Sequence, residues 1–482
     1  MAVRRSLAWT SFGQACFMIM NFAGSIAVAR LLGPFDMGVF AVAMAVVGLI
    51  GVIQALGLDT FIVRENELTP KIIQTAAAVN LTICLVMSTI VVGLALAGGA
   101  LFQQAEVRDV LLVVAIVPII GHFGFLPQAM MERTGDFRTL ALLKACSTAF
   151  GLVITITLAA HGYRFMSLAY SQLATALVSN IAINIIARRH VTFRLSISEW
   201  RRISRFGFQM LAIAGVNRMA TRLTELVLGR TLGVAALGLY SRASSNTGQL
   251  WDSVHGVIGR VVFVDFSNEV RAGRPLRDRY LKVLEVMSGL MWPLFGVVAV
   301  LAGPLIMLVY GERWTGASTP LALLCVSGII LVSTTMSWEV FVVYEETARQ
   351  VRLEAFKTVI GTVLFVAGCF ISLEAAAAAR VAEAVLAQFL YRAHLIRLTK
   401  APPAAFGAIY RRSGLVTLAA IAPALLLMLR WHFSSRVPIE QVALTLLVSG
   451  ILWLAMLRAT RHTLFHEILR LAQRLRPTEV TV

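Results

Sequence analysis

Long apolar runs recur along this chain, and they constrain its fold more than any other feature. A helix needs about 20 apolar residues to cross the hydrocarbon layer of a bilayer, and the sequence contains about fourteen runs of roughly that length. Hydrophobic residues make up 58% of the chain and charged residues only 14%, a composition typical of membrane proteins. Because backbone groups in lipid must be hydrogen-bonded within the chain, we predict an all-α protein that crosses the membrane many times.

The runs fall into two sets of six and a final pair. They lie near residues 7–29, 37–56, 72–96, 110–125, 140–160 and 166–187, then near 206–228, 235–262, 283–309, 318–343, 355–373 and 375–393, and last near 414–429 and 442–456. We therefore expect an N-terminal lobe over 1–200, a C-terminal lobe over 201–400, and two extra helices with a cytoplasmic amphipathic tail over 401–482.

One stretch of the chain is repeated, which indicates that the two lobes are related. Segment 27–40 (AVARLLGPFDMGVF) recurs as segment 226–240 (LVLGRTLGVAALGLY), 200 positions further on. The matched landmarks are Arg30 and Arg230, Leu32 and Leu232, Gly33 and Gly233, and Gly38 and Gly238. Each copy lies between two apolar runs and predicts a turn between helices. Such internal symmetry in a very hydrophobic chain is typical of secondary transporters.

Basic residues indicate how the chain is oriented, because Lys and Arg gather in cytoplasmic loops. Every second loop is rich in them, from Arg4 and Arg5 onward, whereas the intervening loops carry single charges such as Arg164. Both termini are therefore expected in the cytoplasm. The copies are six runs apart, an even number, so the lobes should form a parallel repeat. The net charge of +18 then reflects attraction to anionic headgroups of the membrane, with no nucleic acid as partner.

Candidate site residues lie where charge enters the apolar runs, since an ionisable group at the bilayer centre is costly unless it faces water, a partner or a ligand. In the seventh run, Arg218, Arg222 and Glu225 share one helical face at i, i+4 and i+7. The eighth run places its polar residues on a single face as well. These candidates are Arg242, Asn246 and Gln249, with Asp252 beside them.

The arginines allow two interpretations. They can converge on one anionic ligand, since planar guanidinium groups suit phosphate and carboxylate, or they can form a structural ion pair with Glu225. Three arginines leave positive charge uncompensated, which favours an anion. Glu225, Asp252 and Glu339 are candidates for coupling transport to an ion. Neither a catalytic motif nor a metal-binding pattern is found, so we expect neither an enzyme nor a cofactor.

The chain resembles the polysaccharide transporter branch of the multidrug/oligosaccharidyl-lipid/polysaccharide exporter superfamily, which contains O-antigen and exopolysaccharide flippases. The resemblance rests on ARLLGPFDMGVFAVA followed by GLDTFIVRE, on GRTLGVAALGLYSRAS, and on YGERWTGASTPL, where Gly311, Trp314 and Ala317 match the family pattern. It implies two six-helix lobes in a V around a central cavity, with two extra C-terminal helices. It also implies a location in the bacterial inner membrane.

By resemblance, the implied activity is transfer of undecaprenyl-pyrophosphate-linked oligosaccharide from the inner to the outer leaflet, for lipopolysaccharide or exopolysaccharide synthesis. Arg218, Arg222 and Arg242 then bind the anionic part of the substrate. A polysaccharide polymerase and a chain-length regulator are the implied protein partners. Three alternatives stay open: an ion-coupled multidrug antiporter, a lipid II flippase, and a non-transporting scaffold of a glycan synthesis complex.

Overall fold

The computed structural model describes residues 20–52, 57–65, 67–97, 104–190 and 195–475, and in this part of the chain all regular structure is helical. The chain divides into two compact units, Met1–Gly238 and Leu239–Val482. This division assigns the seventh apolar run to the first unit. The expected boundaries at residues 200 and 400 stay predictions.

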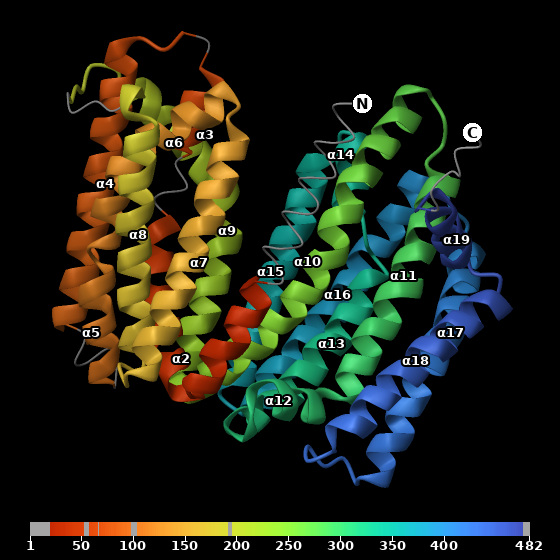
Figure 1. Ribbon diagram of the computed structural model, residues 1–482. Coiled ribbons are helices and arrows are strands. Elements are labelled where there is room, and N and C mark those ends of the chain that lie inside the picture. The colour runs from red at the N-terminus through yellow and green to blue at the C-terminus, as the bar shows by residue number, and fades with distance from the viewer. Residues whose placement is uncertain (1–19, 53–56, 66, 98–103, 191–194, 476–482) are drawn as a thin grey trace, which may run out of the picture. The chain divides into compact units, whose positions relative to one another are not determined.

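The first unit is a bundle of helices that cross one another closely (Figure 1). A helix over Met20–Leu31 is followed by α2 (Pro34–Ile50), α3 (Leu58–Arg64), α4 (Pro70–Ala97), α5 (Ala105–Val114), α6 (Val117–Thr134), α7 (Phe137–Ala160), α8 (Met166–Ile186), the short η2 (Arg188–His190) and α9 (Trp200–Thr231). In this bundle α6 packs against both α4 and α8, α7 packs against α8, and α2 packs against α9.

Both copies of the repeated segment form the predicted turn between helices. In the first copy one helix ends at Leu31 and α2 begins at Pro34; in the second, α9 ends at Thr231 and α10 begins at Val234. Gly233 has φ +90°, a backbone conformation that glycine adopts without steric cost. The two turns therefore occupy matching positions, 200 residues apart.

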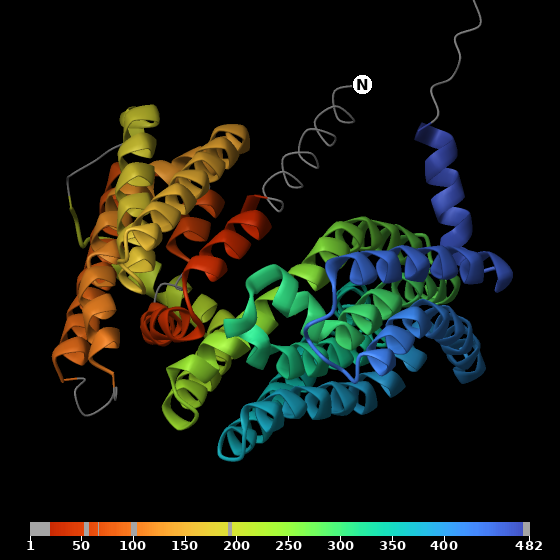
Figure 2. The ribbon, with the colours of Figure 1, turned by 60° about the horizontal axis from the view of Figure 1, so that its bottom comes forward.

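The second unit contains the remaining helices. They are α10 (Val234–Arg271, which begins in the first unit), α11 (Arg277–Val300), α12 (Ala302–Tyr310), η3 (Glu312–Ala317), α13 (Ser318–Val332), α14 (Ser337–Val343), α15 (Thr347–Cys369), α16 (Leu373–Thr399), α17 (Pro403–Arg430), α18 (Ile439–Ala459) and α19 (Thr463–Leu475). Helix α16 packs against α13 and α15, and α11 packs against α13 and α17 (Figures 1 and 2).

Eight helices in the described residues are long and apolar enough to cross a membrane, or up to nine if the bent pair Met20–Leu31 and Pro34–Ile50 counts as one span. The chain is therefore a multi-spanning membrane protein. All fourteen predicted runs overlap helices, but fourteen membrane crossings are not confirmed. Among the described residues, predicted runs are broken between α5 and α6, between α11 and α12, and between α13 and α14, where Met336 has φ +57°.

The C-terminal helix α19 is docked on the second unit. Leu464 is buried, and Phe465 and Ile468 pack against the cluster formed with Val416 and Leu457. The apolar face of α19 therefore contacts protein.

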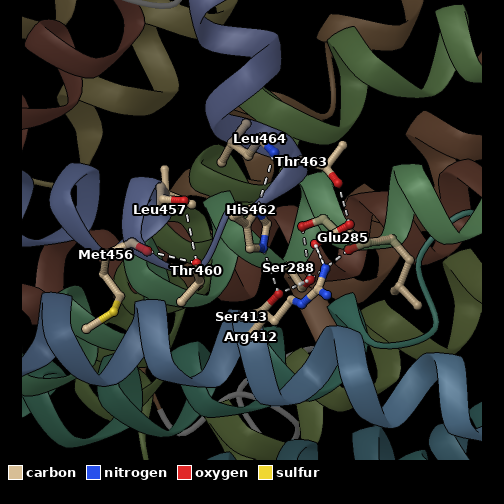
Figure 3. A network of polar contacts seen from close by, with 11 residues as sticks. Glu285, Ser288, Arg412, Ser413, Met456, Leu457, Thr460, His462, Thr463 and Leu464 are labelled. Atoms are coloured by element: carbon tan, nitrogen blue, oxygen red, sulfur yellow. Dashed lines mark hydrogen bonds and ion pairs between the residues drawn. The ribbon is translucent and has the colours of Figure 1, made fainter.

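A polar network fixes the start of α19 (Figure 3). His462 is fully buried; its Nε2 lies 3.1 Å from Ser413 Oγ, and its Nδ1 accepts a hydrogen bond from the Leu464 N–H at 3.2 Å. Ser413 in turn contacts Ser288 on α11 at 2.8 Å. The loop before α19 is thus tied to α17 and α11 by a chain of hydrogen bonds.

Candidate functional site

A cavity of about 1470 Å³ opens within the first unit. Its walls come from helices α2 to α9, and five of these helices, α4 to α8, lie in candidate membrane spans. The cavity volume exceeds the ~300–1,000 Å³ typical of small-molecule pockets. A cavity of this size within a membrane bundle accommodates an oligosaccharide-sized ligand.

Arg222 and Glu225 line this cavity together from α9. Arg222 Nη1 lies 2.8 Å from Glu225 Oε2, and the two side chains retain 38% and 25% of their exposure. From the sequence, an anion-binding role and a structural ion pair were both open. The pair is present, and both residues also line the cavity; an anion-binding role for Arg222 stays a prediction.

A glycine makes room for Arg222. Gly48 on α2 lies so close that a Cβ atom there would be 2.5 Å from Arg222 Nε and 3.0 Å from its Cδ. Any larger residue at position 48 must push the arginine side chain aside. Gly48 therefore positions Arg222 at the cavity wall.

Lys144 on α7 also lines the cavity and was not predicted from the sequence as a site residue. It lies within an apolar run, in the candidate span Phe137–Ala160, and a lysine at such a place is the signal that would have identified it. The charged residues along the cavity wall are Asp59, Glu132, Lys144, Arg222 and Glu225. The described wall thus combines two cations with three carboxylates. Positive charge is therefore confined to the surroundings of Lys144 and Arg222, and this wall as a whole has no excess of cations.

The three predicted arginines are placed differently. The side chain of Arg218 lies outside the described residues, although its backbone belongs to α9. Arg222 belongs to the first unit and Arg242 to the second. Their convergence on one ligand stays a prediction.

Arg242 is buried between aromatic rings in the second unit. The residue is only 5% exposed. Its guanidinium carbon lies 5.0 Å from the ring centre of Tyr310 and 5.3 Å from that of Trp314. The Tyr310 hydroxyl donates a hydrogen bond of 2.7 Å to Asn246 Oδ1. These contacts join the LYSRAS and YGERWTG motifs, and they give Arg242 and Asn246 a packing role whatever they bind.

The other predicted polar residues are spread over the second unit. Gln249 Nε2 lies 3.4 Å from Ser245 Oγ, and Asp252 is exposed. Glu339 on α14 is only 6% exposed, and its Oε1 would lie 3.5 Å from a Cβ atom at Gly259, where His255 is also close. Glu225 lies in the first unit, so the three candidates for ion coupling do not form one group within either unit.

The fold and the cavity define a class: a multi-spanning helical membrane protein whose bundle contains a large cavity with both apolar and charged side chains on its wall. The chain belongs to the family of polysaccharide biosynthesis proteins, whose sequence pattern matches residues 27–319. It is 24% identical over 329 residues to the succinoglycan biosynthesis transport protein ExoT of Rhizobium meliloti, covering 68% of this chain and 67% of that protein. It is 20% identical over 324 residues to the lipopolysaccharide biosynthesis protein WzxC of Escherichia coli, covering 67% and 66%.

Solved structures show that the fold is that of known transporters. The chain matches the lipid II flippase MurJ in its inward closed conformation with a TM-score of 0.73 and 11% identity, over 92% of this chain and 97% of that one. An inward-facing multidrug transporter of the exporter superfamily matches with a TM-score of 0.55 and 14% identity, over 80% and 96%. At these identities the likeness concerns the fold alone.

Proposed function

We propose that this protein moves an undecaprenyl-pyrophosphate-linked oligosaccharide across the bacterial inner membrane for the synthesis of an extracellular polysaccharide or lipopolysaccharide. The observation that carries the proposal is the cavity of about 1470 Å³ with Arg222 on its wall. The family and the names of the relatives ExoT and WzxC support the same function.

The cavity supplies a path for the polar part of such a substrate. A pyrophosphate and a chain of sugars cannot enter hydrocarbon without losing their hydration, which costs several kcal/mol for each unpaired polar group. A chamber lined by polar groups replaces that hydration while the lipid tail stays in the bilayer. Two six-helix lobes that alternate between inward and outward openings, with both termini in the cytoplasm, complete the proposed mechanism.

The anionic headgroup is held by Arg222 and Lys144. Both cations line the cavity, and charge-assisted hydrogen bonds to phosphate are about twice as strong as neutral ones. Glu225 holds the Arg222 guanidinium in the absence of substrate through the 2.8 Å ion pair. When the pyrophosphate displaces this carboxylate, Glu225 becomes available to take up a proton, which gives a route for coupling transport to an ion.

Complementation of a polysaccharide export mutant tests the proposal. The variants Arg222→Gln and Lys144→Gln are compared with wild type for membrane abundance, surface polysaccharide and lipid-linked repeat units. Normal abundance with lost surface polysaccharide and accumulated repeat units is the expected result. Full export by both variants would contradict an anion-binding role for this cavity, and resistance to cationic drugs that depends on Glu225 would favour a multidrug antiporter.

A further inference from the structure

One wall of the cavity is neutral and polar. Gln172, Thr175 and Ser179 lie on α8 at i, i+3 and i+7 and all line the cavity. This spacing places them on a single face of the helix. They lie within the candidate span Met166–Ile186, and polar groups at membrane depth need a polar partner.

These three side chains have no hydrogen-bond partner among the described residues. In the part of the chain that the structure describes, no hydrogen bond joins Gln172, Thr175 or Ser179 to another group through its side chain. Ser171 on the same helix differs, because its hydroxyl is buried and donates to the Gly151 carbonyl at 2.7 Å. A half-buried amide or hydroxyl without a protein partner is completed by water or by a ligand.

Helix α7 has a glycine, Gly151, directly opposite the hydroxyl of Thr175. A Cβ atom at Gly151 on α7 would lie 2.5 Å from Thr175 Oγ1, just as one at Gly48 would lie 2.5 Å from Arg222 Nε. Both the hydroxyl on one wall and the cation on another are thus seated against a glycine of an adjacent helix. Of the three α8 residues, Thr175 is therefore the one packed closely against α7.

We propose that Gln172, Thr175 and Ser179 form a glycan-binding face that reads the sugars of the substrate, separately from the cations that hold its pyrophosphate. Amide and hydroxyl groups both donate and accept hydrogen bonds, and this matches sugar hydroxyl and acetamido groups, which do the same. Three carboxylates and two cations on the wall provide charge, but the α8 face carries none. The inference rests on the proposed function, because it assigns a second part of the same cavity.

Binding to the purified protein in nanodiscs tests the assignment with two probes. One probe is undecaprenyl pyrophosphate without sugar. The other is the complete lipid-linked repeat unit, which is extracted from cells of the source organism in which the gene for this protein has been deleted. The triple variant Gln172→Leu, Thr175→Val, Ser179→Ala removes the polar groups while keeping apolar volume. We expect its affinity for the repeat unit to fall at least about tenfold, since each lost hydrogen bond weakens binding by about two- to tenfold, while its affinity for the bare pyrophosphate stays within about twofold.

Ser171→Ala is the matched control, because it removes a hydroxyl from the same helix that is already bonded to protein. It should leave the ratio of the two affinities unchanged. Equal loss for both probes in the triple variant, or no loss for either, would overturn the glycan-binding face. If the triple variant does not accumulate, Thr175→Val alone is measured, and an unchanged affinity ratio then overturns it.

Arg222→Gln separates this inference from the proposed function. That variant should weaken both probes, because it removes the group that binds their shared pyrophosphate. If it weakens neither probe while the α8 variants still change the affinity ratio, then the pyrophosphate site is wrong and the glycan-binding face stands.

Discussion

Gly38 and Gly238 hold the two copies of the repeated segment in reciprocal contact. A Cβ atom at Gly38 would lie 1.7 Å from the carbonyl oxygen of Val234, and one at Gly238 would lie 2.0 Å from the carbonyl oxygen of Pro34. Position 34 corresponds to 234 and position 38 to 238, so each copy presents the same residues to the other. This is the pattern that a local two-fold axis between the two turns produces, and the relation of the two lobes stays a prediction.

The reciprocal contact predicts that neither glycine tolerates a side chain. Because the obstructing atoms are backbone carbonyls, Gly38→Ala and Gly238→Ala must separate the two helix starts, at a cost of about 1–3 kcal/mol typical of overpacking. Both variants should lower the Tm of the purified protein by similar amounts. Gly121→Ala is the control, since a Cβ atom at Gly121 meets no heavy atom within 4 Å. A wild-type Tm for either variant would show that this crossing is not tight.

Gly48 offers a way to move Arg222 without changing it. Gly48→Ala should displace the guanidinium, break the 2.8 Å ion pair with Glu225, and weaken binding of undecaprenyl pyrophosphate about tenfold, the loss expected for one charge-assisted hydrogen bond. Gly51→Ala is the matched control on the same cavity wall, because its Cβ would lie an ordinary 3.6 Å from Met87 Cε. Unchanged binding in Gly48→Ala, with Gly51→Ala also normal, would exclude a positioning role for Gly48.

Arg242 is expected to stabilise the second unit through its stacking on Tyr310 and Trp314. A desolvated cation–π contact contributes about 0.5–2 kcal/mol, so Arg242→Ala should lower the Tm, and Arg242→Lys should lower it less. Binding of undecaprenyl pyrophosphate by the lysine variant decides between packing and substrate binding. Retained binding indicates packing alone, and lost binding with a near-normal Tm would support the substrate-binding role predicted from the sequence.

Much of the fold was predictable from the sequence because the membrane allows few solutions. Apolar runs of about 20 residues must be helices in lipid, and all fourteen runs overlap helices. The number of crossings was less predictable, because some runs contain charged residues, such as Arg222 in α9 and Arg242 in α10, and these two helices are not among the candidate spans. A break alone does not change the number, since the runs broken near Pro118 and at Met336 each lie in one candidate span.

The candidate site was predictable only along single helices. The i, i+3 relation of Arg222 and Glu225 could be read directly, and their ion pair follows from it. The stacking of Arg242 on Tyr310 and Trp314 depends on residues about 70 positions away, which helical spacing does not reveal. Similarly, Lys144 and the α8 face line the same cavity because α7 and α8 pack together. The spacing of residues along one helix does not predict such packing.

Docking of α19 should depend on pH through His462. Burial lowers the pKa of this imidazole, with Glu285 raising it and the positive charge of Arg412 lowering it further. Its Nδ1 accepts the Leu464 N–H, so protonation would also put two donors in opposition. Because the pKa is lowered in the docked state, the docked helix is fully stabilised above pH 6.5, the ordinary value for histidine, and loses stability as the pH falls toward the lowered pKa.

Hydrogen exchange of α19 between pH 7.5 and pH 5.5, corrected for the intrinsic pH dependence of exchange, measures this effect. Protection of α19 relative to α18 should decrease at the lower pH in the wild type. His462→Gln should remove most of the dependence, because an amide cannot take up the proton, whereas His466→Gln should not, since His466 is exposed on α19. Among the described residues, charged groups around this contact include Glu285, Arg412, Lys282, Glu467 and Arg470. The pKa of the Glu467 carboxylate is lowered by its hydrogen bond to Lys282, so this group should stay ionised over this range. A pH dependence that persists in His462→Gln would assign the titration to a group other than the imidazole.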